Sequence, residues 1–157
     1  MTTVIVCYSL TGRTRKVCAA LAGRLGAEMV EIEAPAVRGG VWGMLRWGFA
    51  ALRGRRTEIR AAVPTLAPGD TLILGAQVWA GRVSVPMRTW LEEAPALPRR
   101  VALVLTSGDT RFPERGFAQF AELCEQAPVA RLHVSQAAAD RGDFAPDLDR
   151  FCAALGA

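Results

Sequence analysis

Short, continuously apolar segments alternate with segments of helical periodicity along this chain of 157 residues. Residues 72–74 and 101–105 contain no polar residue, which is typical of strands buried on both faces. Strands of this kind, each followed by a helix, predict a parallel sheet with helices on both of its faces. The expected strands are residues 4–8, 28–32, 71–75, 101–106 and 129–134, and the expected helices are residues 13–25, 40–52, 85–93, 114–125 and 146–155.

The length and composition favour one folded domain over residues 1–157. Apolar residues make up 51% of the chain, which argues against disorder, and no apolar run is long enough to span a bilayer. The first residues lack the basic segment of a signal peptide. We therefore expect a single α/β domain in the cytoplasm.

The cysteines and the single histidine exclude several kinds of site. Cys7, Cys18, Cys124 and Cys152 all lie in apolar periodic segments and form no Cys-x-x-Cys pair, so we expect reduced, buried thiols. His133 is the one histidine, and we expect it at a strand end. Neither a metal site nor a Cys/His hydrolase is predicted, and no catalytic residue is assigned.

A short polar loop joins the first expected strand to the first expected helix. It reads Tyr8-Ser9-Leu10-Thr11-Gly12-Arg13-Thr14. A strand that runs through such a loop into a helix points several backbone N–H groups, and the positive end of the helix dipole, at one place. The hydroxyl groups of Ser9, Thr11 and Thr14 add donors there. The loop therefore predicts a binding site for a phosphate monoester, with simple helix capping as the alternative.

The spacing Ser-x-Thr-Gly-x-Thr resembles the loop that holds the FMN phosphate in flavodoxins. It differs from a Walker A loop, which needs Gly-Lys-Ser/Thr, and from the Gly-x-Gly-x-x-Gly fingerprint of dinucleotide-binding domains. The resemblance implies that Ser9, Leu10, Thr11, Gly12, Arg13 and Thr14 bind the phosphate.

A second loop is expected after a strand that ends at Gly75. It contains Gln77, Val78, Trp79, Ala80 and Gly81, and Ser84 can cap the following helix, which has Pro86 in its first turn. The loop resembles the second flavin-binding loop of the flavodoxin family, with Ala76 and Gln77 in place of the usual hydroxyl residue and proline. We expect Trp79 to stack on a flat ring, and the alternative is that it packs the loop onto the next helix.

A third loop, Thr106-Ser107-Gly108-Asp109, follows the most apolar strand. It resembles the third loop of the same family, although Asp109 replaces a small residue, and a simple turn is the alternative. An acid beside a flavin would disfavour the anionic reduced form. Tyr8 and Phe112 are candidates for further aromatic contacts.

Taken together, the three loops identify the chain as similar to the flavodoxin-like family over nearly its whole length. The resemblance implies a three-layer sandwich with a five-stranded parallel sheet in the order 2-1-3-4-5 and helices on both faces. It also implies FMN as the cofactor.

A basic, aromatic segment covers residues 38–56. It contains five arginines together with Trp42, Trp47 and Phe49. We expect a helix that lies on the sheet through Val41, Leu45, Phe49 and Leu52, with the arginines outward. The alternative is a docking surface for an acidic redox partner. Membrane association is disfavoured, because two glycines in the segment lower helix propensity, and nothing else supports nucleic-acid binding.

The sequence therefore predicts an FMN-binding redox protein, either an electron carrier or an oxidoreductase that reduces a small acceptor such as a quinone. The net charge of +4 favours acidic redox partners. The alternative is a flavodoxin-like scaffold without flavin that serves in binding or regulation, which Ala76, Gln77 and Asp109 favour. The oligomeric state stays open.

Overall fold

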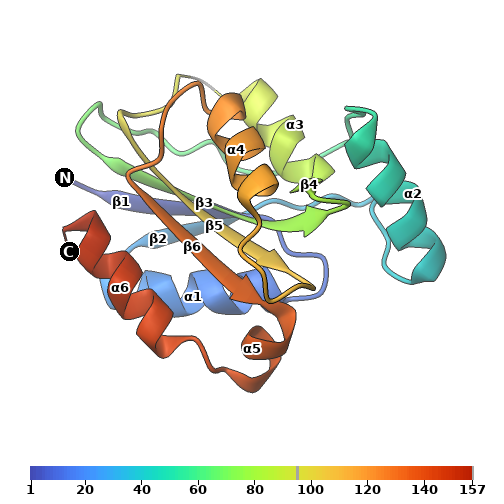
Figure 1. Ribbon diagram of the computed structural model, residues 1–157. Coiled ribbons are helices and arrows are strands. Elements are labelled where there is room, and N and C mark those ends of the chain that lie inside the picture. Colours follow the sequence, from blue (N-terminus) through green and yellow to red (C-terminus); the bar gives the residue numbers. More distant parts are fainter. Residues whose placement is uncertain (95, 157) are drawn as a thin grey trace.

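Five parallel strands form the centre of the computed structural model, which describes residues 1–94 and 96–156. Their order across the sheet is β2-β1-β3-β5-β6, and a short strand, β4, pairs antiparallel with the end of β3 (Figure 1). This order of the five parallel strands confirms the order implied by the resemblance. The strands are β1 (Thr3–Cys7), β2 (Glu28–Glu31), β3 (Thr71–Trp79), β4 (Arg82–Val83), β5 (Arg100–Ser107) and β6 (Ala130–Ser135).

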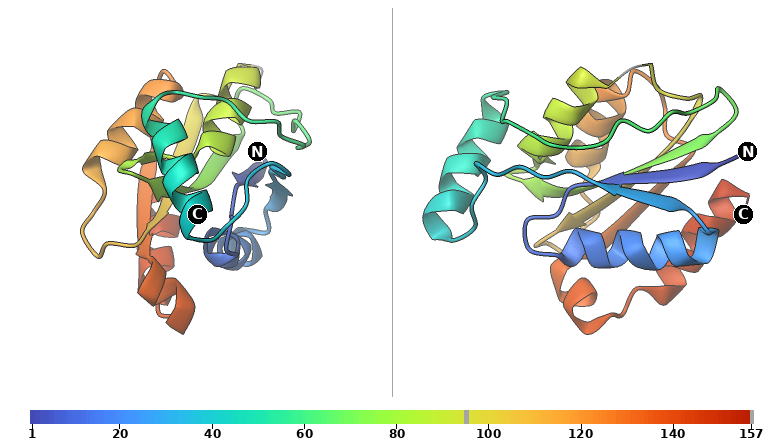
Figure 2. Two further views of the ribbon diagram at one scale, coloured as in Figure 1. Left: turned by 90° about the vertical axis from the view of Figure 1, so that its right-hand side faces the viewer. Right: turned by 180° about the vertical axis from the view of Figure 1, so that it is seen from behind.

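Helices cover both faces of the sheet, so the fold is the expected three-layer sandwich. One face carries α1, α5 and α6, the other carries α3 and α4, and α2 lies beyond one end of the sheet (Figures 1 and 2). The helices are α1 (Arg13–Leu25), α2 (Val41–Leu52), α3 (Val85–Glu93), α4 (Glu114–Leu123), α5 (Gln136–Arg141) and α6 (Ala145–Leu155).

The alternation of side chains along the central strands explains why these runs are apolar throughout. In β1, Val4 and Val6 pack into the core beneath α3 and α4, whereas Ile5 and Cys7 pack into the core beneath α1 and α6. Neither face meets water, so neither face needs a polar residue. The cysteines are free in the structure, with Cys7, Cys18 and Cys124 buried and Cys152 half-buried.

The expected end of the third strand at Gly75 is wrong. β3 continues to Trp79 and turns back into β4, with Val78 paired to Val83 and Trp79 to Arg82. The two residues of the turn, Ala80 and Gly81, have φ angles of 50° and 76°. A hairpin turn with two positive φ angles usually contains Asn-Gly or Asp-Gly, so Ala-Gly gives a weak sequence signal.

The expected orientation of the basic helix is also wrong. Val41, Leu45, Phe49 and Leu52 do share one side of α2, but that side faces outward and the helix buries Trp47, Ala50 and Ala51 instead. The packed side contains Gly48, at which an added Cβ would lie 3.9 Å from the Ala80 Cβ. Helix α2 thus lies within ordinary van der Waals contact of the β3–β4 turn at Gly48, while Val41, Leu45, Phe49 and Leu52 remain outside.

No helix in residues 1–94 and 96–156 has the length and apolar character needed to cross a membrane.

Candidate functional site

The three predicted loops meet at the edge of the sheet formed by the carboxyl ends of the strands. We call residues 9–14 the first loop, residues 77–81 the second loop and residues 106–109 the third loop. The backbone N–H of Leu10 donates to Gln77 Oε1 at 3.0 Å, which joins the first loop to the second. The hydroxyl groups of Thr14 and Thr106 lie 2.8 Å apart, which joins the first loop to the third. In parallel α/β sheets, ligands bind at this edge.

The first loop leaves the amino end of α1 open. Gly12 occupies the N-cap position with φ 88°, and no side chain within the described part of the chain caps the first turn of the helix. The first-turn N–H groups therefore remain available to an anion, next to the positive end of the helix dipole. The alternative of simple helix capping is met by Gly12 alone, because none of the hydroxyl groups described in the loop forms a capping hydrogen bond.

The Ser9 hydroxyl is the second unusual feature of the first loop. Its oxygen is buried and has no hydrogen-bond partner among the described residues. A buried polar atom without a partner costs free energy unless a ligand or water supplies the missing bond. The hydroxyl thus marks a place in the loop where a polar ligand group fits.

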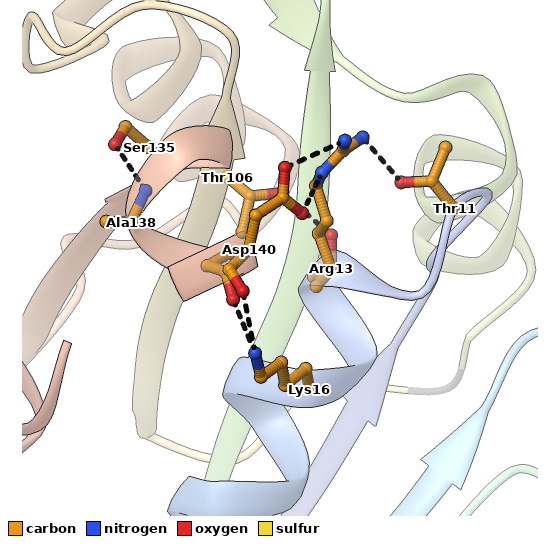
Figure 3. Close-up of polar contacts among 9 residues, drawn as sticks. Thr11, Arg13, Lys16, Thr106, Ser135, Ala138 and Asp140 are labelled. Atoms are coloured by element: carbon orange, nitrogen blue, oxygen red, sulfur yellow. Dashed lines mark hydrogen bonds and ion pairs between the residues drawn. The ribbon is translucent and has the colours of Figure 1, made fainter. Parts of the chain in front are cut away.

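The other predicted phosphate donors are more constrained. Thr14 is fully buried, and its hydroxyl is engaged with Thr106. The exposed Thr11 hydroxyl accepts a hydrogen bond from Arg13 Nη1 at 3.3 Å (Figure 3). Gln77 is buried, and its Oε1 already accepts a hydrogen bond from the Leu10 N–H. Thr11 can therefore turn toward a ligand, whereas Thr14 supports the loop from beneath.

Helix α5 fixes the first loop from the side, and the sequence analysis did not identify it. Arg13 forms two hydrogen bonds with the Asp140 carboxylate, at 2.8 and 3.0 Å, and Lys16 Nζ donates to the Ala139 carbonyl oxygen at 2.7 Å (Figure 3). The hydrogen bond from Arg13 lowers the pKa of Asp140. Ser135 caps α5 by accepting from the Ala138 N–H at 3.2 Å.

The second and third loops line an open cavity of about 530 Å³. This volume lies within the usual range for small-molecule sites. Phe112 stacks on Phe117 beside the cavity, with ring centres 4.7 Å apart. The cavity is lined by Val78, Ala80 and Gly81 of the second loop, by Ser107, Gly108 and Asp109 of the third loop, and by residues 111–116. The sequence did not indicate most of residues 111–116, because they belong to no recognisable motif.

Trp79 lies outside the lining of this cavity. Its half-buried indole makes an edge-to-face contact with Tyr8, with ring centres 5.9 Å apart and an angle of 88° between the rings. Burial raises the pKa of Tyr8, which keeps its phenol neutral. Trp79 thus stands beside the residue that leads into the first loop, while Val78 faces the cavity.

The third loop is held by a chain of hydrogen bonds that begins at His133 in β6. The Ser107 hydroxyl donates its one proton to the Asp109 carbonyl oxygen at 3.0 Å, so His133 Nε2, 2.8 Å away, donates to the Ser107 oxygen. Burial lowers the pKa of His133, which favours the neutral ring. The Asp109 carboxylate accepts from the Arg111 N–H at 3.0 Å, as in a polar turn.

Comparisons with known proteins give a match in structure but none in sequence. No family model and no curated protein matches the chain. A flavoprotein of Lactobacillus acidophilus, solved in complex with FMN, superposes with a TM-score of 0.67 at 19% identity, over 89% of this chain and 97% of that one. A Bacteroides eggerthii protein provisionally named a flavoprotein has a TM-score of 0.67 at 17% identity, over 96% and 98% of the two chains.

Both matches extend over nearly the full length of each chain, and they agree with the strand order and the layers described above. Identities below one fifth establish a common fold and leave the ligand to be argued from the residues. This chain therefore has the flavodoxin-like fold that it shares with these flavoproteins.

Proposed function

We propose that this chain binds FMN across the three loops and works as a redox protein. The observation that carries the proposal is the open amino end of α1 beside the buried Ser9 hydroxyl, which has no partner among the described residues. Both features suit a phosphate monoester. The protein of the same fold that was crystallised with FMN supports the choice of this ligand.

The residues of the first loop would hold the phosphate mainly with neutral donors. Ser9 and Thr11 would supply hydroxyl groups, and the first-turn N–H groups of α1 would supply the remaining hydrogen bonds. Arg13 is already engaged with Asp140, so it would contribute positive potential more than a direct contact. Thr14 and Thr106 would hold the first loop against the end of β5.

The cavity between the second and third loops would take the ring system. When bound, FMN supplies one- and two-electron redox chemistry, and the protein supplies its position and surroundings. The backbone of the third loop is fixed by Ser107 and His133, and the aromatic wall is provided by Phe112. Trp79 would need to approach the ring from the side of the first loop, so its stacking role stays a prediction.

The test is a titration of the flavin-free protein with FMN and with riboflavin, followed by quenching of flavin fluorescence. Because riboflavin lacks the phosphate, we expect it to bind far more weakly than FMN. Inorganic phosphate should compete with FMN and should have little effect on riboflavin. Equal affinities for FMN and riboflavin would contradict the assignment of the first loop.

The reaction that follows from FMN binding is electron transfer to a protein partner or to a small acceptor such as a quinone. The net charge of +4 favours an acidic protein partner, and the location that we propose is the cytoplasm. Turnover of a soluble quinone with a chemical reductant would support an oxidoreductase, whereas fast reoxidation by an acidic redox protein alone would support a carrier.

One observation favours a second candidate, a scaffold that binds without flavin. The Leu10 N–H already donates to Gln77 Oε1, and the Thr14 hydroxyl is already hydrogen-bonded to the Thr106 hydroxyl. Part of the hydrogen-bonding capacity of the first loop is therefore used within the protein. A purified protein that is yellow, with a flavin absorption band, supports the first candidate. A colourless protein that does not respond to added FMN supports the second.

A further inference from the structure

Helix α2 presents an unusually apolar outer side. Six large apolar side chains of this one helix have 51–84% of their surface exposed. Their spacing along the helix places them on one side of it, and α2 protrudes from the rest of the molecule in Figure 1 and in the right-hand view of Figure 2. These residues are Val41, Trp42, Met44, Leu45, Phe49 and Leu52, and we call them the α2 face.

Positive charge borders the α2 face, and negative charge is absent from the same stretch of sequence. Residues 34–57 contain five arginines and no aspartate or glutamate. Arg46 lies over the ring of Trp47, and Arg53 lies over the ring of Phe49, at 5.6 and 4.5 Å from the ring centres. Within the described residues, Arg56 alone of the five forms an ion pair, with Glu92.

Three of these arginines surround a small cavity at the border of the α2 face. The cavity has a volume of about 190 Å³ and is lined by Arg46, Arg55 and Arg56 together with Trp47, Phe49 and Ala50. Arg56 is paired with Glu92, whereas Arg46 and Arg55 form no ion pair within the described residues. Arginines beside a cavity, free of a carboxylate, are suited to a phosphate group. The apolar side chain of Phe49 belongs both to this cavity and to the α2 face, so a ligand with a phosphate and an acyl chain would meet both.

The packed side of α2 shows that the helix is held with this face outward. Arg88, which is almost fully buried, donates to the Ala51 and Arg55 carbonyl oxygens at 2.8 and 3.1 Å and so fixes the carboxyl end of α2. At Gly43 an added Cβ would lie 2.1 Å from the Arg38 carbonyl oxygen. Gly43, one of the two glycines that argue against a membrane-binding helix in the sequence, therefore lets the segment that precedes α2 lie directly against the helix.

We infer that the α2 face binds the surface of a membrane that contains anionic lipids. A helix with large apolar side chains on one side and arginines along its border lies flat in the interface between headgroups and acyl chains. Anionic headgroups complement the arginines, and the three-arginine cavity provides a place for one of them. This inference does not depend on FMN binding.

The same charges oppose two other occupants. A second copy related by a two-fold axis would bring identical arginines together without any carboxylate from residues 34–57 to pair with them. An acidic protein would satisfy the arginines but would leave six large apolar side chains to be covered by a charged surface. An anionic bilayer satisfies both parts of the surface.

The position of α2 brings the candidate site to the same surface. Leu52 of the α2 face and the turn residues Ala80 and Gly81 line one further cavity, of about 290 Å³. Ala80 and Gly81 also line the larger cavity between the second and third loops. A protein bound through α2 would therefore hold that site close to the bilayer, where an acceptor dissolved in the lipid can reach it.

The experiment is co-sedimentation of the full chain with vesicles of phosphatidylcholine alone or mixed with phosphatidylglycerol. The charge variant is Arg46→Gln with Arg55→Gln, and its control is Arg99→Gln with Arg141→Gln, which removes the same charge from exposed positions outside α2. The apolar variant is Trp42→Ser with Leu45→Ser, and its control is Val63→Ser with Val129→Ser, at other exposed apolar positions.

We expect binding to the anionic vesicles only. The charge variant should bind roughly 25-fold more weakly than the wild type, which is about fivefold for each arginine. The apolar variant should bind more weakly by roughly tenfold or more. Both controls should bind as the wild type does. Tryptophan fluorescence should shift to the blue on binding, and a Trp42→Phe variant should lose most of this shift.

Three results would overturn the inference. One is failure of the wild type to bind anionic vesicles, and another is equal binding by the α2 variants and their controls. The third is a dimer in analytical ultracentrifugation that dissociates in the apolar variant while no vesicles are bound, since α2 would then be an interface between copies. Circular dichroism of each variant confirms that the fold is intact, which is expected because Trp42 and Leu45 are exposed.

Discussion

Replacement of Ser9 by alanine should change protein stability and FMN affinity in opposite directions. The Ser9 oxygen is buried without a partner in the described residues, and such a group costs about 1–3 kcal/mol relative to a satisfied one. Ser9→Ala should therefore stabilise the flavin-free protein by about 1 kcal/mol. For a chain of this size, that raises the melting temperature by roughly 2–4 °C.

The same substitution should weaken FMN binding. A hydrogen bond to a charged phosphate contributes about 1.5–3 kcal/mol, so its loss should raise the Kd for FMN by roughly 10- to 150-fold. The Kd for riboflavin should change little, because riboflavin has no phosphate. Thermal unfolding of the flavin-free protein and fluorescence titration of the same sample measure the two effects separately.

Ser84 offers a matched control. Its hydroxyl is also buried without a partner in the described residues, but it lies at the start of α3, on the opposite face of the sheet from α1. Ser84→Ala should stabilise the protein in the same way and leave FMN affinity unchanged. A lower melting temperature for Ser9→Ala, or an unchanged Kd for FMN, would refute the assignment of the Ser9 hydroxyl to the phosphate.

Further predictions concern the core beneath the first loop, the indole beside it and the histidine behind the third loop. An added Cβ at Gly75 would lie 2.4 Å from Cys18 Sγ, so Gly75→Ala should destabilise the protein by about 1–3 kcal/mol in urea unfolding, and Cys18→Ala in the same chain should recover part of this loss. If Trp79 contacts the flavin, FMN should quench tryptophan fluorescence more in the wild type than in Trp79→Phe; equal quenching would exclude the contact. Burial lowers the pKa of His133 from its ordinary value of 6.5. As the pH falls, the unfolded chain therefore binds a proton at His133 before the folded protein does, and the free energy of unfolding should fall below about pH 6.5. Urea unfolding at several pH values should show a weaker dependence for His133→Gln, and an identical dependence would contradict the burial effect.

The sheet and most of the helices could be predicted because they follow from local patterns. Strands buried on both faces are continuously apolar. The bounds predicted for α1 and α3 agree with the structure, because Gly12 marks the start of α1 and Ser84 with Pro86 marks the start of α3. The order of the parallel strands came from the family resemblance of the three loops, which local periodicity alone does not provide.

The remaining features depend on contacts that no local pattern encodes. The helical period of α2 correctly groups Val41, Leu45, Phe49 and Leu52. Periodicity does not say whether this side or the opposite side, with Trp47, Ala50 and Ala51, will meet the rest of the protein. The ion pair of Arg13 with Asp140 joins residues 127 positions apart, and α5 has six residues, too few for a periodic signal.

The contacts of the first loop also set when it can form during synthesis. Its partners Gln77, Thr106 and Asp140 follow the residues that they contact by 67, 92 and 127 positions. At roughly 5–20 residues per second, Asp140 is made about 6–25 s after Arg13. A nascent chain therefore carries the first-loop sequence long before it can build the first-loop structure, and the opening residues of the protein are among the last to reach their final arrangement.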